Sequence, residues 1–474
     1  MANEAEVFDV IVIGAGPVGT TVAMRAVRGG LSVAVVERRL AGGECEYYGC
    51  VPRKALLLPV ELADEVDRMP GVARHAPIDA QAVFARRDDF VSHHDDTAVV
   101  SDIENYPATF VRGQGRLAGE LRAEVSAPDG SVRSLRARHA VVLATGSDPY
   151  VPDVPGLRDA HPWTNREVTS TEQAPKRLVV IGGGAVACEM AQAMCSLGAQ
   201  ETTMLVAGER LLRRTEPFAG DLVAQSFQNV GIDVRLGRFV TEVERPVPGG
   251  PVTVHIDDGS QLEADEILVG TGREPVVRGI GLETIGVEVD GAIEVDSSMR
   301  ATAVPDGWLY AIGDVNGRNQ LTHMGKYQAR VCGDVIAARA NGLPDEGPRL
   351  HDIADDKGAP QAIFTDPQVL AVGRTEAKAR SDGFNVRTVE YDVGNVIGAQ
   401  LQADGYTGQA KAVVDEDRGT LIGFTLVGPA VVDHLHAATI AVTAEVPIDS
   451  LWHAVPAFPT ASEFWLRLME TYGL

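Results

Sequence analysis

The sequence predicts an α/β protein with two strand–helix–strand units and a separate C-terminal α+β domain. Two apolar, β-branched runs indicate the units, one at residues 7–13 and one at residues 177–181. Each is followed by a glycine-rich turn and a stretch of small residues that favours a helix. From Leu350 onward, strand-like and helix-like segments alternate, which predicts the third domain. Both glycine-rich units have the pattern of Rossmann-like, dinucleotide-binding domains.

The first unit begins with the run at residues 7–13, which is typical of a strand buried on both faces of a parallel sheet. A turn of the form G-x-G-x-x-G follows, and its glycines are Gly14, Gly16 and Gly19. These glycines let a pyrophosphate approach the N-terminus of the next helix, expected over about residues 20–29. A second strand at residues 32–36 precedes Glu37, which can accept hydrogen bonds from a ribose. Together these features predict a dinucleotide site.

The same pattern recurs after the strand predicted at residues 177–181. Its turn places Gly182, Gly184 and Ala187 at the three fingerprint positions, and the third position tolerates alanine. Two dinucleotide sites predict two nucleotides, one a tightly held flavin and the other a diffusible nicotinamide. The alternative is one functional site and a decayed duplicate.

The strand at residues 202–206 bears on the choice of nicotinamide. NADH-specific sites carry an acid at the end of this strand, whereas NADPH-specific sites carry arginine for the 2′-phosphate. Here the strand is followed by Ala207 and Gly208, and Arg213 and Arg214 come next. We therefore favour NADPH slightly over NADH.

The composition excludes several classes of protein. The chain of 474 residues has a formal charge of −24 and no long Lys/Arg run, which argues against nucleic acid or an anionic membrane as a partner. No apolar run approaches the roughly 18 residues of a membrane span, and the acidic N-terminus lacks a basic signal-peptide region. We therefore expect a cytoplasmic protein.

Two of the five cysteines, Cys45 and Cys50, form a close pair just downstream of the first unit. Pro52 favours the first turn of a helix, which would place Cys50 near the helix N-terminus. The partial positive charge there lowers a thiol pKa toward the reactive thiolate. A thiol pair beside a flavin is suited to passing two electrons between a nicotinamide and a disulfide. The alternative is that both cysteines pack as small hydrophobic residues.

The other three cysteines lie on predicted helices, where we expect inert core residues; they are Cys188, Cys195 and Cys332. No Cys/His spacing predicts a metal site.

Ordered motifs along nearly the whole chain are similar to those of one enzyme family. Cys-x4-Cys is followed by Val-Pro-x-Lys at residues 51–54, and later segments read Ala-Thr-Gly at 144–146, Gly-Thr-Gly-Arg at 270–273, Ala-Ile-Gly-Asp at 311–314 and Phe-Thr-Asp-Pro at 364–367. With the two fingerprints, this set resembles the class I FAD-dependent pyridine nucleotide–disulfide oxidoreductases. That family includes dihydrolipoamide dehydrogenase, glutathione reductase and mercuric reductase.

The resemblance implies a homodimer whose chains each have four regions. Residues 1–150 would form the first part of the FAD-binding domain, with the redox cysteine pair, and residues 151–273 the NAD(P)-binding domain. Residues 274–345 would form the central region, which is the second part of the FAD-binding domain. Residues 346–474 would form the dimerisation domain.

In such enzymes, electrons pass from NAD(P)H through FAD to a redox disulfide, here Cys45–Cys50, and on to a disulfide or another small acceptor. The resemblance implies that Cys50 faces the flavin and Cys45 faces the substrate. It also implies that Lys54 and Glu189 pair near flavin N5, and that Asp314 bonds the ribityl chain. The remaining cofactor-binding residues that it implies are Gly14, Gly16, Gly19, Glu37, Arg38, Gly43, Gly115, Thr145, Gly146, Gly182, Gly184, Ala187, Arg213, Gly272 and His323.

The C-terminus departs from the family pattern. Disulfide reductases of the family carry His-Pro-Thr-x-x-Glu, in which the histidine shuttles protons to the substrate-side thiol of the partner subunit. Here Phe458 stands in the place of the histidine, although Glu463 is kept. Phenylalanine carries no proton, so an acid–base contribution of typically about 10²–10⁴-fold is missing. His453 is the nearest candidate replacement, and packing near Trp452 is the simpler interpretation of it.

Three explanations of this departure remain open. The enzyme could reduce a disulfide with protons from water or Glu463. It could instead reduce an acceptor that needs no thiol protonation, such as a quinone, a dye or a metal ion. Phe458 could also exclude protons, as in C–S cleavage and carboxylation by the relative 2-ketopropyl coenzyme M oxidoreductase/carboxylase. Mercuric reductase activity is disfavoured, because residues 469–474 contain none of the terminal cysteines of those enzymes.

Overall fold

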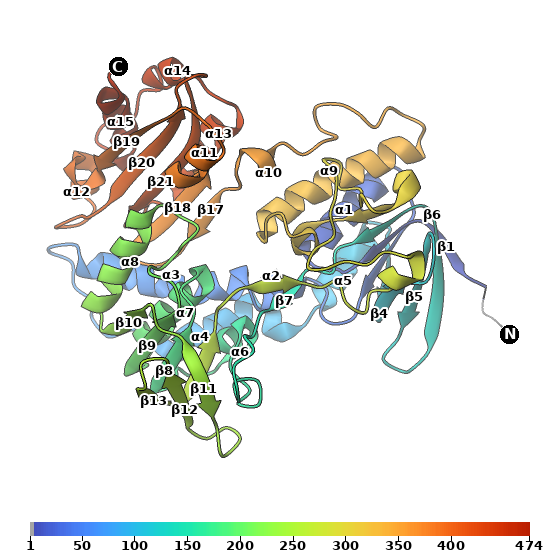
Figure 1. The fold of residues 1–474 in the computed structure, drawn as a ribbon, viewed down its shortest axis with the longest axis horizontal. Helices are drawn as coiled ribbons and strands as arrows, with labels where there is room; N and C mark the ends of the chain where they lie inside the picture. Colours follow the sequence, from blue (N-terminus) through green and yellow to red (C-terminus); the bar gives the residue numbers. More distant parts are fainter. Residues whose placement is uncertain (1–3) are drawn as a thin grey trace. The chain divides into compact units, whose positions relative to one another are not determined.

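The computed structural model describes residues 4–474, so the first three residues of the acidic N-terminus lie outside the described part. Within residues 4–474, no helix is both long and apolar enough to cross a membrane. The chain forms two compact units, each assembled from three segments (Figure 1). Unit 1 comprises residues 1–52, 88–149 and 273–356, and unit 2 comprises residues 53–87, 150–272 and 357–474.

Unit 1 is built on a seven-stranded sheet with the order β3-β2-β1-β6-β5-β4, in which β16 pairs with β6. β1, β2, β3 and β16 run parallel to their neighbours, whereas β4 and β5 add an antiparallel edge. A short β7–β15 ribbon completes the unit. Its strands are β1 Glu6–Ile13, β2 Val33–Glu37, β3 Thr109–Arg112, β4 Gln114–Leu117, β5 Arg122–Ser126, β6 Val132–Leu143, β7 Ser147–Pro149, β15 Arg273–Pro275 and β16 Leu309–Ala311.

The helices of unit 1 follow the strands of the sheet. α1 begins at Pro17, three residues before the predicted start, because proline favours the first helical position. α1 packs along α9 with very little space between them, since a Cβ on Gly29 would lie 2.4 Å from Ala337 Cβ. The helices are α1 Pro17–Arg28, α2 Gly43–Tyr47, α5 Thr97–Asn105, α9 Thr322–Ala340 and α10 Ala354–Lys357, whose last residue belongs to unit 2.

Unit 2 contains three sheets. A four-stranded parallel sheet has the order β10-β9-β8-β14, and a small antiparallel sheet has the order β11-β12-β13. The C-terminal segment forms a five-stranded antiparallel sheet with the order β17-β18-β21-β20-β19. The strands are β8 Arg177–Ile181, β9 Glu201–Val206, β10 Ile232–Leu236, β11 Val240–Glu244, β12 Val252–Ile256, β13 Gln261–Ala264, β14 Glu266–Val269, β17 Gln361–Ile363, β18 Gln368–Gly373, β19 Val386–Asp392, β20 Gln409–Asp415 and β21 Thr420–Gly428.

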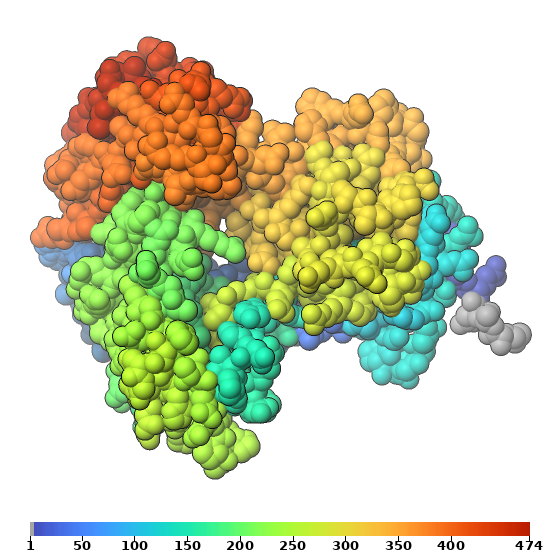
Figure 2. Space-filling model, in the orientation of Figure 1, coloured from blue at the N-terminus to red at the C-terminus, as the bar shows by residue number. Residues whose placement is uncertain are grey.

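The helices of unit 2 cover these sheets, and two of them cross the boundary between the units. α3 Cys50–Asp67 has its first three residues in unit 1, and α4 Ala80–Phe90 has its last three there. α8 lies against β21, so the parallel sheet and the C-terminal sheet share one body, coloured green and orange-red (Figure 2). The other helices are α6 Asn165–Ser170, α7 Ala185–Ser196, α8 Pro217–Asn229, α11 Glu376–Ser381, α12 Ile397–Gln400, α13 Leu435–Thr443, α14 Ile448–Trp452 and α15 Phe464–Tyr472.

The structure confirms the predicted fold class, with two parallel strand–helix units and a C-terminal α+β region. The division into four domains at residues 150, 273 and 345 stays a prediction. The chain passes from unit 1 to unit 2 between Pro149 and Tyr150 and returns to unit 1 between Gly272 and Arg273. Residues 53–87 also belong to unit 2.

A buried cation joins the C-terminal sheet of unit 2 to the helices α8 and α11. Lys411 Nζ on β20 lies 3.1 Å from Glu216 Oε2 at the start of α8 and 2.8 Å from Glu376 Oε2 on α11. Hydrogen bonds to these carboxylates raise the pKa of Lys411 despite its burial, and the bond to Lys411 lowers the pKa of Glu376. Glu216 is almost fully buried, so the ammonium group of Lys411 compensates a carboxylate that water does not reach.

We expect Lys411→Met to lower the free energy of unfolding by about 3–5 kcal/mol, because it leaves the buried Glu216 carboxylate uncompensated. Urea denaturation followed by circular dichroism measures this change. The matched control is Lys378→Met, which breaks an exposed pair with Asp382 and should cost less than about 1 kcal/mol. Equal effects of the two substitutions would contradict the interpretation.

Candidate active site

The two cysteines of the predicted pair lie on either side of a sharp bend in unit 1. Cys45 lies in the short helix α2, and Cys50 is the first residue of α3, as the sequence predicted. Gly49 makes the bend possible, since a Cβ there would lie 2.9 Å from Glu44 O and 3.1 Å from Cys45 Cα. Neither cysteine is in a disulfide in this structure; Cys50 is exposed and Cys45 is partly buried.

The two thiols are in hydrogen-bond contact with each other, and this contact, followed by burial, raises the pKa of Cys45. The hydroxyl of Thr322, at the start of α9, lies 3.4 Å from Cys50 Sγ. A hydrogen bond from Thr322 acts in the opposite direction and lowers the pKa of Cys45. Sequence reasoning missed Thr322, because 272 residues separate it from Cys50.

The first glycine-rich turn leaves space where a nucleotide phosphate would bind. A Cβ on Gly14 would lie 2.2 Å from Ala144 O, and one on Gly19 would lie 1.9 Å from Gly14 O, so larger residues cannot replace these two. A Cβ on Gly16 would meet only Gly43 Cα, at 4.0 Å. Gly16 is also the N-cap of α1 and leaves that helix terminus without a side-chain cap. These residues fit the pyrophosphate of FAD.

Glu37 lies at the end of β2, where the sequence predicted a ribose-binding acid. Its carboxylate accepts hydrogen bonds from the backbone N–H of Ala15 at 2.9 Å and of Arg39 at 2.8 Å. Glu37 therefore also holds the glycine-rich turn against the end of the second strand.

A second polar group in unit 1 surrounds Asp314, which lies in the turn η4 Gly313–Asn316. Ser147 Oγ donates a hydrogen bond of 2.5 Å to Asp314 Oδ2 and accepts one of 2.7 Å from Arg273 Nε. Burial raises the pKa of Asp314, and the hydrogen bond from Ser147 opposes that shift. Ser147 follows the Ala-Thr-Gly motif and Arg273 is the last residue of the Gly-Thr-Gly-Arg motif, but sequence reasoning gave neither of them a role.

The other predicted cofactor residues of unit 1 have diverse surroundings. Gly43 packs against Gly16, because a Cβ on it would lie 2.9 Å from Gly16 Cα. Gly115 packs beneath β2, where its Cβ would lie 2.9 Å from Val36 Cγ1, so its small size already has a packing explanation. Arg38 Nη1 lies 3.5 Å from Gln114 Oε1, and the hydroxyl of Thr145 donates a hydrogen bond to Val276 O. Gly146 has a left-handed backbone conformation, and His323 is exposed.

The second glycine-rich turn, in unit 2, repeats the geometry of the first. A Cβ on Gly182 would lie 2.5 Å from Gly270 O, whereas one on Gly184 would lie 3.9 Å from the same oxygen, at ordinary contact distance. Ala187 is fully buried, and a Cβ on Gly270 would lie 2.8 Å from the Cβ of Ala187. Gly272 has a φ of +137°, which few other residues adopt. This turn fits a second dinucleotide.

The expected ion pair between Lys54 and Glu189 is not formed. Lys54 Nζ instead lies 2.8 Å from Glu61 Oε2, two turns along α3, and 4.2 Å from the centre of the Phe364 ring. Glu189 Oε2 pairs with Arg53 Nη1 at 2.6 Å, and its Oε1 accepts the backbone N–H of Phe364 at 3.0 Å. Glu189 is nearly fully buried, so the guanidinium of Arg53 supplies the compensating charge.

The C-terminal residues that depart from the family pattern, and those near them, differ in how exposed they are. Phe458 is 74% exposed, and His453 is exposed just after α14. Glu463 is buried; its Oε1 accepts a hydrogen bond of 2.9 Å from Arg467 Nη2. Its Oε2 is buried and has no hydrogen-bond partner in the described residues.

The remaining cysteines lie on the predicted helices. Cys188 and Cys332 are fully buried in α7 and α9, and burial raises the pKa of each. Cys195 in α7 is partly buried, and burial raises its pKa too. None of these thiols has the environment of a reactive cysteine.

Comparison with known proteins bears directly on these motifs. The profile of the family described as Pyridine nucleotide-disulphide oxidoreductase matches residues 8–329, and that of its dimerisation domain matches residues 359–468. The chain belongs to this family. Its members depend on FAD and use NAD(P)H, so the predicted enzyme class is confirmed.

The curated relatives of the chain include two kinds of enzyme. The chain is 31% identical to the dihydrolipoyl dehydrogenase of Chlamydia muridarum over 470 residues, covering 97% of this chain and 96% of that protein. It is 33% identical to the mercuric reductase of Shigella flexneri over 452 residues, covering 93% of this chain and 77% of that protein.

Solved structures share the fold of the chain. The HOCl-induced flavoprotein disulfide reductase RclA from Escherichia coli, in its Cu(II) complex, aligns with a TM-score of 0.83 at 23% identity, covering 98% of this chain and 99% of that one. LpdA from Mycobacterium tuberculosis aligns with a TM-score of 0.83 at 22% identity, covering 99% and 100%. At this identity the likeness shows the fold alone.

We expect Cys50→Ala to lower the pKa of Cys45, because it removes the contact that raises this pKa most. Thr322→Val should raise it, because it removes a hydrogen bond that lowers it. The rate of iodoacetamide alkylation of Cys45 in the reduced protein, followed against pH by mass spectrometry, measures both shifts. The buried Cys188 serves as an internal unreactive reference. Shifts in the same direction in both variants would contradict the assignment.

Proposed function

We propose that the protein is an FAD-dependent NAD(P)H oxidoreductase that reduces a Cys45–Cys50 disulfide and passes the electrons to a small acceptor. The observation that carries this proposal is the thiol pair itself. Cys50 occupies the first position of α3, and the two sulfur atoms are close enough for hydrogen-bond contact. The helix N-terminus stabilises a thiolate at Cys50, which is the form that takes part in thiol–disulfide exchange.

The overall step balances as NAD(P)H, a proton and the disulfide giving NAD(P)⁺ and two thiols. FAD, when bound at the first glycine-rich turn, would supply two-electron transfer between nicotinamide and sulfur. The chain's own residues divide the remaining work. Cys45 would face the acceptor, Cys50 would hold the negative charge, and Ser147 and Arg273 would fix the carboxylate of Asp314.

Anaerobic titration of the purified protein with NADPH and NADH tests this proposal. We expect a long-wavelength absorbance band at two electrons per subunit, and its loss in the Cys45→Ser/Cys50→Ser variant. Bleaching of the flavin without this band would falsify the thiol relay. Comparing the two nicotinamides also tests our slight preference for NADPH, which is supported by the position of Arg213: its Cδ lies 2.8 Å from where a Gly208 Cβ would be.

A second candidate acceptor class is favoured by the C-terminal motif. Phe458 cannot deliver a proton, and one oxygen of Glu463 is already held by Arg467. We propose on this ground that quinones, or other acceptors that need no proton from a side chain, are reduced faster than disulfides. Proton-excluding C–S cleavage and carboxylation remains the third alternative, and an assay for carbon dioxide uptake distinguishes it from reduction.

We also propose that the protein is a homodimer in which a second copy covers an exposed apolar surface of the dimerisation domain. Exposed apolar side chains of this domain include Ile440, Trp452, Val455 and Phe458, which are 53%, 41%, 85% and 74% exposed in the single chain. Light scattering of the purified protein should give twice the chain mass, and a monomer would contradict the proposal.

We expect Phe458→His to raise disulfide turnover by about 10²-fold or more, because it restores a general acid–base group. The resemblance implies that Glu463 would orient the new imidazole, and its Oε2 has no hydrogen-bond partner in the described residues. Steady-state turnover with a panel of disulfides and quinones measures the change, and quinone reduction should stay unaltered. Phe458→Asn, which is polar but has no titrating proton, is the matched control. An unchanged disulfide rate in Phe458→His would show that proton supply is not limiting.

A further inference from the structure

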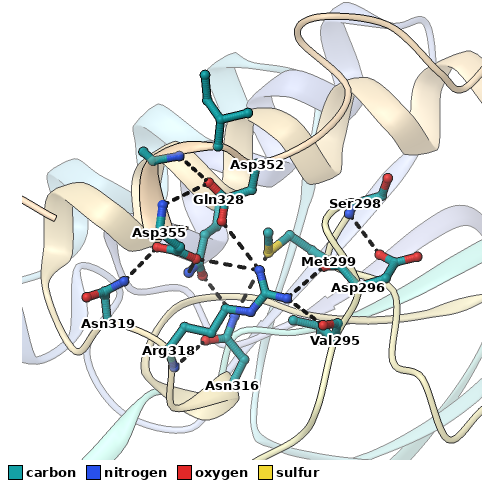
Figure 3. A network of polar contacts seen from close by, with 12 residues as sticks. Val295, Asp296, Ser298, Met299, Asn316, Arg318, Asn319, Gln328, Asp352 and Asp355 are labelled. Carbon is teal, nitrogen blue, oxygen red and sulfur yellow. Dashed lines mark hydrogen bonds and ion pairs between the residues drawn. The ribbon is translucent and has the colours of Figure 1, made fainter. Parts of the chain in front are cut away.

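A buried network of polar side chains lies next to the turn that carries Asp314 (Figure 3). All of its members belong to unit 1. It joins η4, α9, α10 with the residues just before it, and the loop at residues 295–299. Gln328 on α9 is at its centre and is completely buried.

The amide of Gln328 has only one possible orientation. Its Oε1 accepts the backbone N–H of Gly313 at 2.8 Å and the side-chain amide of Asn316 at 2.9 Å. Its Nε2 donates to Asp355 Oδ2 at 2.9 Å. A backbone N–H can only donate, so the oxygen of the amide must face Gly313, and this places the NH₂ group against Asp355.

Gly313 and Asn316 are the first and last residues of the turn that contains Asp314. Asn316 Nδ2 also donates to Ala311 O at 3.2 Å, which fixes the turn to the end of β16. Gln328 therefore holds both ends of this turn from one side-chain oxygen. A shift of that oxygen would move the backbone on either side of Asp314.

The carboxylate of Asp355 is in turn held from two other directions. Its Oδ1 accepts a hydrogen bond of 2.7 Å from Asn319 Nδ2. Arg318 Nη1 lies 3.6 Å from its Oδ2 and 3.4 Å from Asp352 Oδ2. Arg318 Nη2 donates to Val295 O at 2.5 Å, so the guanidinium cannot rotate freely. The network is thus anchored at both ends.

We propose that Gln328 and Asp355 are positioning residues for the flavin: they fix the turn at Gly313–Asn316 so that Asp314 faces the ribityl chain. This inference rests on the proposed FAD site and on the proposed contact of Asp314. Gln328 itself is buried beneath the turn and acts through Asp314. The relay ends at Asp355, whose carboxyl oxygen accepts the hydrogen bond that Gln328 donates.

The test is the rate of FAD release from the holoenzyme, followed by flavin fluorescence after dilution. We expect Gln328→Leu to speed release about tenfold or more, because the buried N–H of Gly313 loses its partner. We expect Asp314→Ala to do the same. In the Asp314→Ala background, Gln328→Leu should raise the rate of FAD release further by less than about twofold, because its effect passes through Asp314.

A second pair of variants tests the relay even if Gln328→Leu does not fold. Gln328→Glu keeps the shape and the acceptor toward Gly313 but places an oxygen against Asp355, so we expect faster FAD release. Gln328→Glu/Asp355→Asn supplies a donor at residue 355 and should return the release rate to within about threefold of the wild type.

The matched control is Gln192→Leu in unit 2. Gln192 is also a buried glutamine that accepts a backbone N–H, that of Asp366, at 2.8 Å. The Gln192→Leu substitution should destabilise the protein but leave the rate of FAD release unchanged.

The outcomes separate this inference from the proposed function. If Asp314→Ala speeds FAD release and Gln328→Leu does not, only the inference is wrong. The same holds if the effect of Gln328→Leu persists in full without Asp314, or if the double exchange gives no rescue. If Asp314→Ala has no effect, the proposed contact with FAD is wrong as well.

Discussion

The close approach of two backbone segments is the constraint on which both nucleotide turns depend. In unit 1 the turn after β1 meets the residue after β6, and in unit 2 the turn after β8 meets the residue after β14. At Gly14 and at Gly182 a Cβ would lie within 2.5 Å of a carbonyl oxygen on the other segment. The third residue of each turn, Gly16 or Gly184, in contrast lies at the start of a helix and has room for a Cβ, with no neighbour closer than 3.9 Å. The crossing that forbids a side chain thus also aims a bare helix terminus at the space where a pyrophosphate fits.

Much of the fold could be predicted because strands buried on both faces have a clear sequence pattern. The runs at residues 7–13 and 177–181 became β1 and β8 nearly to the residue. The pairing of Lys54 could not be predicted in the same way. Arg53 and Lys54 are neighbours on α3, about 100° apart around the helix axis. Which of them reaches Glu189 depends on how α3 is rotated against α7, and that rotation is set by packing in the core of unit 2.

The C-terminal motif shows a further limit of sequence reasoning. The sequence shows that Phe458 replaces a proton carrier, and this chemical conclusion needs no structure. The ion pair of Glu463 with Arg467 could also be predicted, since Arg467 follows four residues later on the same helical face. That one carboxylate oxygen stays buried without a partner could be seen only from the packing around it. The Thr322–Cys50 contact and the Gln328 network join residues too distant in sequence for any spacing rule.

The contact between α1 and α9 has a consequence for the order of folding. Arg25 on α1 and Asp334 on α9 form a two-pronged ion pair although 309 residues separate them. The N-terminal strand–helix unit therefore cannot cover its helix until the ribosome has made about 340 residues. The strands of residues 177–269 are complete long before that point and have one another as partners. During synthesis the middle of the chain can fold first, while the segment made earliest waits for one made near the end.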